Sequence, residues 1–141
     1  MGGRGRDSGI DWDEEMGIKV RYPDEGAESN VKPGNYNDLP ENAKNAYDGY
    51  EKNGWNGNYN GQAPGTAAGG KYSNYDEKLP TSDSVGNSIT YKEFDINAPV
   101  PGIGRDAERF IAGSDGSIYY TDSHYGDIIS PSGLPPFLKI K

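Results

Sequence analysis

The sequence contains no cysteine and only one histidine. Without cysteine the chain cannot form a disulfide framework, a thiolate metal site or a cysteine nucleophile. A single histidine also excludes a zinc site built from several histidines. Hydrophobic residues are scarce, at 32%, and no run approaches the about 20 apolar residues that a membrane-spanning helix needs. We therefore expect no bound metal, no cofactor and no association with a membrane.

Glycine, tyrosine and proline are frequent, with 21, 11 and 10 residues. So much glycine and proline places a large part of the chain in turns and loops, while the aromatic side chains supply apolar area for a small core. The net charge of -8 argues against a protein that coats nucleic acid, because phosphate binding depends on Lys and Arg. It does not exclude a nuclease, because an enzyme needs only a local positive cleft.

The pattern of the sequence changes near residue 39. Residues 1–38 are rich in glycine and acidic residues and show no sustained hydrophobic period, a composition that favours a mobile segment. With 141 residues, the chain has room for one domain and a tail. We expect a linker or loosely docked arm over residues 1–38 and one folded domain over residues 39–141.

One amphipathic helix is expected at the start of this domain. Apolar residues recur there at spacings of three and four, which forms a single helical stripe: Leu39, Ala43, Ala46, Tyr47 and Tyr50. Pro40 suits the first turn, and Asn53 followed by Gly54 supplies a stop. Residues 54–88 hold clusters of glycine, asparagine, proline and serine, which predict a long loop with a short helix or strand near Tyr72.

Strands are expected after residue 88. Residues 88–97 alternate in polarity, which predicts Phe94 and Ile96 on the core face of a strand and Glu93 on its open face. Residues 128–129 and 137–140 offer one or two further strands. The pattern as a whole predicts an α+β fold, with one or two N-terminal helices packed on a four- to five-stranded antiparallel sheet.

A hairpin is expected around Asp115 and Gly116. This dipeptide separates two β-rich runs and favours a two-residue turn, which would pair Arg109 with Asp122. Because side chains alternate along a strand, His124 would rejoin the face of Arg109 two residues further on.

Four residues carry groups that together suit RNA cleavage without a metal: Glu93, Arg105, Arg109 and His124. A carboxylate can take the proton of a ribose 2′-hydroxyl, an imidazolium can protonate the leaving 5′-oxygen, and guanidinium groups can stabilise the charge on the phosphorus centre. Each residue alone also has an ordinary structural interpretation. An exposed strand glutamate is usually solvated, and either arginine could pair with Asp106, Glu108 or Asp122.

Short motifs keep one order along the predicted domain: Leu39-Pro40, Gly54-Trp55, Pro64-Gly65, Gly69-Gly70, Tyr72-Ser73-Asn74, Lys78-Leu79-Pro80, Lys92-Glu93-Phe94-Asp95-Ile96-Asn97, Arg105 and Arg109, Ser114-Asp115, Ile118-Tyr119 and Asp122-Ser123-His124-Tyr125. This series resembles the barnase-like microbial ribonucleases. The resemblance implies a metal-independent endoribonuclease that cleaves single-stranded RNA by transesterification through a 2′,3′-cyclic phosphate.

The resemblance also implies roles for individual residues. It makes Glu93 the general base and His124 the general acid, with Arg105 and Arg109 on the scissile phosphate. Tyr125 resembles the family's aromatic wall against the substrate base, where stacking contributes roughly 1 to 3 kcal/mol per base.

A guanine-binding loop is implied at four consecutive residues: Ser73, Asn74, Tyr75 and Asp76. The family's arginine is Tyr75 here and its glutamate is Asp76, with Glu77 as a possible substitute. Guanine preference is expected, with a purely structural turn as the alternative. The family's catalytic helix lysine has no direct counterpart, because its position falls near Ala46 or Tyr47. Lys44, one turn before Tyr47, is the candidate to replace it.

We expect RNA as substrate and a monomeric toxin domain of a larger protein, secreted or delivered into a target cell by a signal that this chain lacks. A cognate inhibitor or immunity protein is expected, because the active enzyme would kill its producer. Two alternatives stay open. One is a non-catalytic RNA- or protein-binding module that keeps the fold. The other is a metal-dependent nuclease using Asp95, Asp122 and Asp127, which lack a compact ligand spacing.

Overall fold

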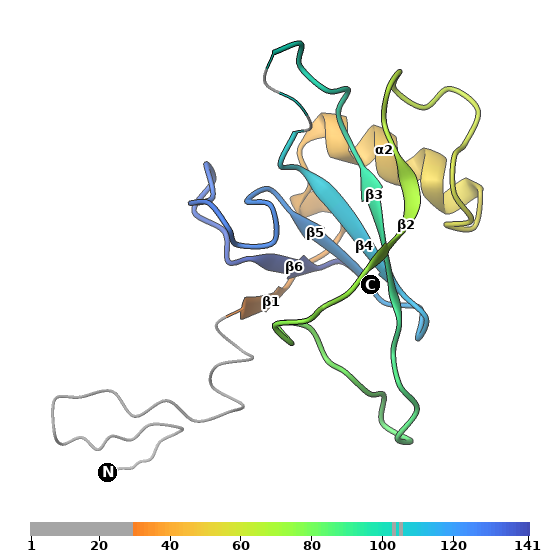
Figure 1. Cartoon of the computed structure of the whole chain (residues 1–141), viewed down its shortest axis with the longest axis vertical. Coiled ribbons are helices and arrows are strands. Elements are labelled where there is room, and N and C mark those ends of the chain that lie inside the picture. Colours follow the sequence, from red (N-terminus) through yellow and green to blue (C-terminus); the bar gives the residue numbers. More distant parts are fainter. Residues whose placement is uncertain (1–29, 103, 105) are drawn as a thin grey trace, which may run out of the picture.

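The computed structural model describes residues 30–102, 104 and 106–141. In this part of the chain, one α-helix covers one face of a six-stranded sheet whose strand order is β1-β6-β5-β4-β3-β2 (Figure 1). The elements are, in chain order, β1 (Val31–Pro33), the 3-10 turn η2 (Tyr36–Asp38), α2 (Glu41–Lys52), β2 (Ala68–Tyr72), β3 (Tyr91–Asp95), β4 (Arg109–Gly113), β5 (Ile118–Thr121) and β6 (Phe137–Lys139). Among these residues, no helix is both long and apolar enough to cross a bilayer.

The predicted helix is confirmed as α2, which begins directly after Pro40. Its buried residues are Ala43, Ala46 and Tyr50, as the spacing of three and four predicts. Gly54 lies just past the last turn with a φ of 69°. A residue with a side chain adopts this backbone conformation only with strain, so Gly54 explains why the helix ends here.

The main core lies between α2 and the sheet. Phe94 of β3 is fully buried, and its ring contacts those of Tyr50 and Trp55 at centroid distances of 5.0 and 5.1 Å, edge to face. Phe110 and Tyr120 extend the same cluster across β4 and β5. The prediction that Phe94 marks the core face of its strand is confirmed, and the tyrosines and tryptophan supply much of the packing.

The predicted hairpin is present, but its predicted register is wrong by one residue. Arg109 pairs with Thr121, not with Asp122. The turn contains three residues rather than two, because the N–H of Gly113 donates to the carbonyl of Ser117 at 2.8 Å. Gly116, with a φ of 90°, occupies the left-handed position that ends a three-residue hairpin loop.

The sheet differs from the predicted four- to five-stranded antiparallel sheet in its number of strands and in one pairing. β1 lies parallel to β6, with Val31 opposite Phe137, and the other pairings are antiparallel. Residues 31–33, which lie within the predicted arm, therefore form an edge strand of the sheet. Residues 1–29 of the predicted arm lie outside the described residues.

The strand predicted at residues 128–129 is absent. Ile128 and Ile129 lie in the loop before β6, and Ile129 is 93% exposed. The strand predicted over residues 137–140 is present as β6, which pairs with both β1 and β5. The prediction failed because a run of two apolar residues is too short to show the period of a strand, and such a run also occurs in exposed loops.

Candidate active site

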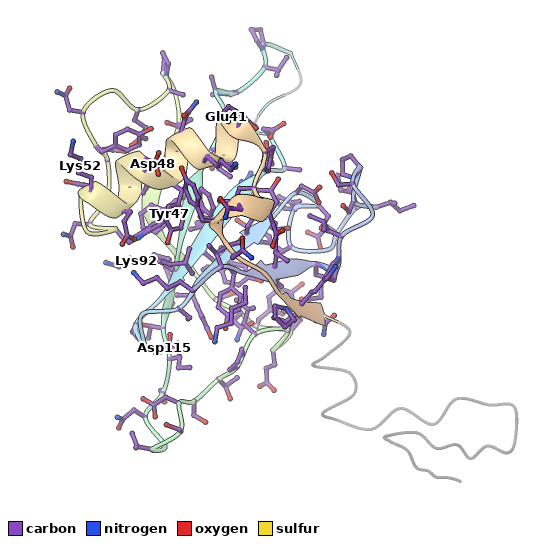
Figure 2. The ribbon with its side chains drawn as sticks, turned by 180° about the vertical axis from the view of Figure 1, so that it is seen from behind. Glu41, Tyr47, Asp48, Lys52, Lys92 and Asp115 are labelled. Atoms are coloured by element: carbon purple, nitrogen blue, oxygen red, sulfur yellow. The ribbon has the colours of Figure 1, made fainter. Side chains whose placement is uncertain are left out.

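The sheet face opposite α2 carries a second, more polar group of side chains. Because side chains alternate along β3, Glu93 and Asp95 point away from the core that contains Phe94. The pairing of β3 with β4 sets Asp95 opposite Arg109. A smaller apolar cluster surrounds this group, with Ile111 at its centre. Figure 2 views the molecule from behind, from the side of the sheet that α2 covers.

Arg109 connects the polar residues of the two central strands. Its side chain is 5% exposed, and its Nε lies 3.3 Å from Oδ1 of Asp95. Its Nη1 donates to Oε1 of Glu93 at 3.2 Å, and Nε and Nη2 both donate to the carbonyl oxygen of Asp106. A buried charge is tolerated when it is paired and hydrogen-bonded, so Arg109 and the two carboxylates stabilise one another.

Tyr125 is the fourth side chain of this network. Its hydroxyl donates to Oε1 of Glu93 at 2.5 Å and accepts from Nη1 of Arg109 at 3.0 Å. Burial, together with the hydrogen bond to Glu93, raises the pKa of Tyr125 well above its usual value. The hydroxyl therefore stays protonated and continues to donate to the carboxylate. The Tyr125 ring also packs against Tyr72, with the ring centroids 4.7 Å apart.

His124 lies at the exposed edge of this network. Its side chain is 43% exposed, and its Nδ1 lies 2.8 Å from Oδ2 of Asp127. Its ring contacts that of Tyr125 at a centroid distance of 4.8 Å. Since Tyr125 also bonds to Glu93, one side chain contacts both the predicted general base and the predicted general acid.

The backbone at His124 is in a conformation that bulky residues rarely adopt. The φ values of His124 and Tyr125 are 51° and 65°, and the N–H of Gly126 donates to the carbonyl of Ser123 at 3.1 Å. Positive φ at both central residues is the mark of a type I′ turn. For residues with side chains this costs of order 1–3 kcal/mol each, and such strain is frequent at functional sites.

Contacts from neighbouring segments stabilise the turn. Oγ1 of Thr121 accepts hydrogen bonds from the backbone N–H groups of Ser123 and Tyr125. From the other side, Nζ of Lys78 donates to the carbonyl oxygen of Tyr125 at 3.0 Å. These bonds compensate part of the backbone strain and determine where the His124 side chain leaves the sheet.

The structure thus brings together Glu93, Arg109, Tyr125 and His124. Arg105 lies outside the described residues. The structure does not bring Lys44 to this group. Its Nζ lies 5.7 Å from the centroid of the Tyr36 ring, and α2, which carries Lys44, covers the opposite face of the sheet.

The predicted guanine loop adjoins the site through Lys78, which also pairs with Asp76 at 3.1 Å. Asn74 is buried, and its side chain bonds to both the N–H and the carbonyl of Leu79, so its amide closes the loop. Ser73, Tyr75 and Asp76 are exposed, with Tyr75 at 88%. The Asn74 side chain therefore shapes the turn, while its three neighbours face solvent.

Two contacts of the His124 turn were not predicted. Asp127 contacts His124, and the spacing of three residues between them was a signal that could have suggested it. Lys78 contacts the turn from a distant segment, which no local pattern indicates. In the described part of the chain, no group of three or more His, Asp or Glu side chains is positioned to hold a metal ion. Asp95, Asp122 and Asp127 therefore do not form such a group.

This face of the sheet presents a carboxylate, an imidazole and a guanidinium, groups that together can act on a phosphodiester. A sequence model of the ribonuclease family, described as ribonuclease, matches residues 23–129. The chain therefore belongs to the ribonuclease family, which confirms the resemblance identified from its motifs and supports endoribonuclease activity. No curated protein sequence matches this chain. The matched range includes β1 through β5 and the His124 turn.

Proposed function

We propose that this ribonuclease is a metal-independent endoribonuclease that cleaves single-stranded RNA by transesterification. Glu93 takes the proton of the ribose 2′-hydroxyl, and the 2′-oxygen attacks the phosphorus atom. The bond between phosphorus and the 5′-oxygen breaks, and His124 protonates that oxygen. The products are a 2′,3′-cyclic phosphate and a free 5′-hydroxyl. Water then hydrolyses the cyclic phosphate with the two roles reversed.

One observation carries this proposal. The Tyr125 side chain contacts both Glu93 and His124, so a carboxylate and an imidazole lie on one face of the sheet with a single aromatic ring between them. Transesterification requires a base on one side of the phosphodiester and an acid on the other. The Glu93 side chain is 24% exposed and that of His124 is more so, which allows both to meet a substrate.

Positive charge at the phosphate comes from arginine in this proposal. Arg109 is bonded to Glu93, so the guanidinium can stabilise negative charge on the phosphate while the base removes a proton beside it. Arg105 is assigned the same role from its place in the sequence. Tyr125 is proposed to contact the substrate base with its ring.

We further propose a preference for guanine through the loop of Ser73, Asn74, Tyr75 and Asp76. The exposure of Ser73, Tyr75 and Asp76 beside the Tyr125 turn supports it, because these groups can reach a base without rearrangement of the core. Dinucleotides that differ only in the base on the 5′ side would test it. Guanine should give the highest kcat/KM, and equal values for guanine and adenine would contradict the preference.

The biological setting proposed is a monomeric toxin domain that is secreted or delivered into a target cell. An inhibitor or immunity protein would protect the producer, because the cleavage of cellular RNA is lethal. Expression of the active chain in a bacterial host, with the His124→Ala variant as control, would test this. Toxicity of the active chain alone supports the proposal, and equal growth of both hosts contradicts it.

A second candidate function is a non-catalytic binding module with the same fold. The observation that favours it is the position of Lys44, which packs against Tyr36 and leaves the site without the family's helix lysine. The two functions differ in one simple assay. Purified protein incubated with single-stranded RNA in EDTA should yield fragments that end in 2′,3′-cyclic phosphate, whereas a binding module would leave the RNA intact.

The rate should also depend on pH in a bell-shaped manner. The base must be deprotonated and the acid protonated at the same time, so kcat/KM falls on both sides of an optimum. DNA should resist cleavage because it lacks the attacking 2′-hydroxyl. A flat profile between about pH 5 and pH 8, or a loss of RNA cleavage in EDTA, would point to different chemistry.

A further inference from the structure

We propose that Asp127 is a positioning residue for His124, aligning the imidazole so that Nε2 delivers the proton to the leaving oxygen. The inference rests on the proposed function, because it concerns how the general acid of that reaction is held. Its basis is the distance of 2.8 Å between Nδ1 of His124 and Oδ2 of Asp127. The two residues lie three apart in one tight turn.

The chemistry of the two groups assigns the proton in their hydrogen bond. An ionised carboxylate only accepts hydrogen bonds, so Nδ1 of His124 must be the donor. The partner of one ring nitrogen determines the role of the other. With Nδ1 occupied by Asp127, Nε2 is the nitrogen that donates to the 5′-oxygen.

The same contact serves both steps of the reaction. In the first step the bond from Nε2 to hydrogen breaks, the 5′-oxygen gains that proton and departs from phosphorus. The neutral ring keeps its proton on Nδ1, bonded to Asp127, and leaves a lone pair on Nε2. In the second step this lone pair takes a proton from water, whose oxygen attacks phosphorus, and the departing 2′-oxygen recovers a proton from Glu93.

The turn itself fixes the geometry of the pair. The N–H of Asp127 donates to the carbonyl of His124 at 3.1 Å, and the N–H of Ile128 donates to that of Ser123 at 3.1 Å. The His124 ring is bounded by Tyr125 on one side and by the Asp127 carboxylate at Nδ1. An exposed histidine without this partner would sample several staggered rotamers. Asp127 therefore restricts His124 to the orientation that the turn makes available.

The exposure of the His124 and Asp127 side chains determines how much a substitution of Asp127 should lower kcat. Both side chains are accessible to solvent, so the pair is weaker than a buried carboxylate–histidine pair of a hydrolase. We expect Asp127→Asn and Asp127→Ala to lower kcat about tenfold, less than the hundredfold or more expected for the loss of the general acid itself. KM should change little, because Asp127 acts through His124 and not on the substrate.

Two substrates separate positioning of the acid from a structural role. One is a ribodinucleotide, whose 5′-oxygen needs a proton to leave. The other carries a p-nitrophenyl group at the same phosphate, and nitrophenolate departs without one. Asp127→Asn should be slower on the dinucleotide and equal to wild type on the aryl substrate. Equal losses on both substrates, or no loss on either, would overturn the proposal.

Two further variants act as controls. Asp48→Asn is the same chemical change at an exposed residue of α2 (Figure 2), and it should leave both rates unchanged. His124→Ala combined with Asp127→Ala should be no slower on the dinucleotide than His124→Ala alone, because Asp127 then has nothing to position. An additional tenfold loss in the double variant would mean that Asp127 acts independently of His124.

A spectroscopic measurement tests the contact without activity. His124 is the only histidine in the chain, so ¹⁵N chemical shifts of its ring can be read without assignment. The neutral ring should carry its proton on Nδ1 in the wild type and shift toward Nε2 in Asp127→Ala. The same tautomer in both proteins would overturn the proposal. If the wild-type protein leaves RNA intact, the proposed function is refuted. That outcome differs from an unchanged tautomer, which refutes only the role of Asp127.

Discussion

The two faces of the central strands β3 and β4 differ in almost every respect. On one face Phe94 and Phe110 are fully buried among aromatic rings, and α2 covers them. On the other face, one residue away along each strand, Glu93 and Arg109 form a hydrogen-bonded polar network. Because side chains alternate along a strand, the same short stretch of backbone supports the core on one face and the proposed active site on the other.

The two faces also obtain their stability from different sources. The helix-covered face removes aromatic surface from water, which is favourable in proportion to the area buried. The polar face buries charged groups, which is costly unless every one is paired. We infer that the packed face keeps the backbone rigid, and that this rigidity allows the polar face to hold its side chains in one arrangement.

The largest expected effect is the loss of the core ring in Phe94→Ala. Removal of a buried phenylalanine leaves a cavity and costs about 3 to 5 kcal/mol of unfolding free energy. Glu93→Gln, at the neighbouring position on the other face, should cost less than about 1 kcal/mol, because the amide oxygen can still accept from Tyr125. Urea denaturation followed by tryptophan fluorescence measures both, and equal losses would contradict the division between the faces.

Substitutions on the polar face should lower catalytic activity much more than they lower stability. We expect Glu93→Gln and His124→Ala each to lower the rate of RNA cleavage by about a hundredfold or more, equivalent to about 2.7 kcal/mol in the activation barrier. Unfolding free energy should change little in either variant. Wild-type activity in both variants would refute the assignment of the base and the acid.

A finer comparison uses one tyrosine from each face. The Tyr125 hydroxyl donates to Glu93, and the Tyr120 hydroxyl donates to Glu108. Tyr125→Phe and Tyr120→Phe should each cost about 1.5 to 3 kcal/mol of stability, because each removes a hydrogen bond to a charged carboxylate. Tyr125→Phe also removes the bond that the hydroxyl accepts from Arg109. Only Tyr125→Phe should also lower kcat, since its hydroxyl is bonded to Glu93, the proposed general base. A similar reduction of kcat in both variants would mean that the effect is one of general stability.

The smallest expected effect concerns the backbone of the His124 turn. His124→Gly and His124→Ala both remove the imidazole, but only glycine adopts a φ of 51° without strain. The glycine variant should therefore be more stable than the alanine variant by about 0.5 to 1 kcal/mol, while neither cleaves RNA at an appreciable rate. If the alanine variant is the more stable, the turn is not strained at this residue.

Much of the fold could be predicted from local patterns. The spacing of Ala43, Ala46 and Tyr50 predicted α2, and alternation predicted which face of β3 carries Phe94 and which carries Glu93. The family resemblance was also readable from short motifs in order. These features depend on residues close together in the chain, and the physical rules that relate them to structure are local.

Other features depended on contacts that no local pattern contains. Ser114 joined the hairpin turn and shifted the register by one residue. β1 is three residues long and ends in proline, so it shows no period, and it forms only by pairing with a strand about a hundred residues later. Lys44 was expected near the site on the basis of the helix alone, but the side of the sheet on which α2 packs keeps it away.

By itself the sequence determined the type and polarity of each central element, because helix and strand periods select which residues share a face. It also determined the chemical groups available at the site, because the sequence supplies Glu93, His124 and the arginines near β4. Only the tertiary structure decided that Tyr125 connects Glu93 to Arg109 and that Asp127 contacts His124. Hydrogen bonds of this kind require distances and directions between side chains, which exist only once the strands and the strained turn have packed together.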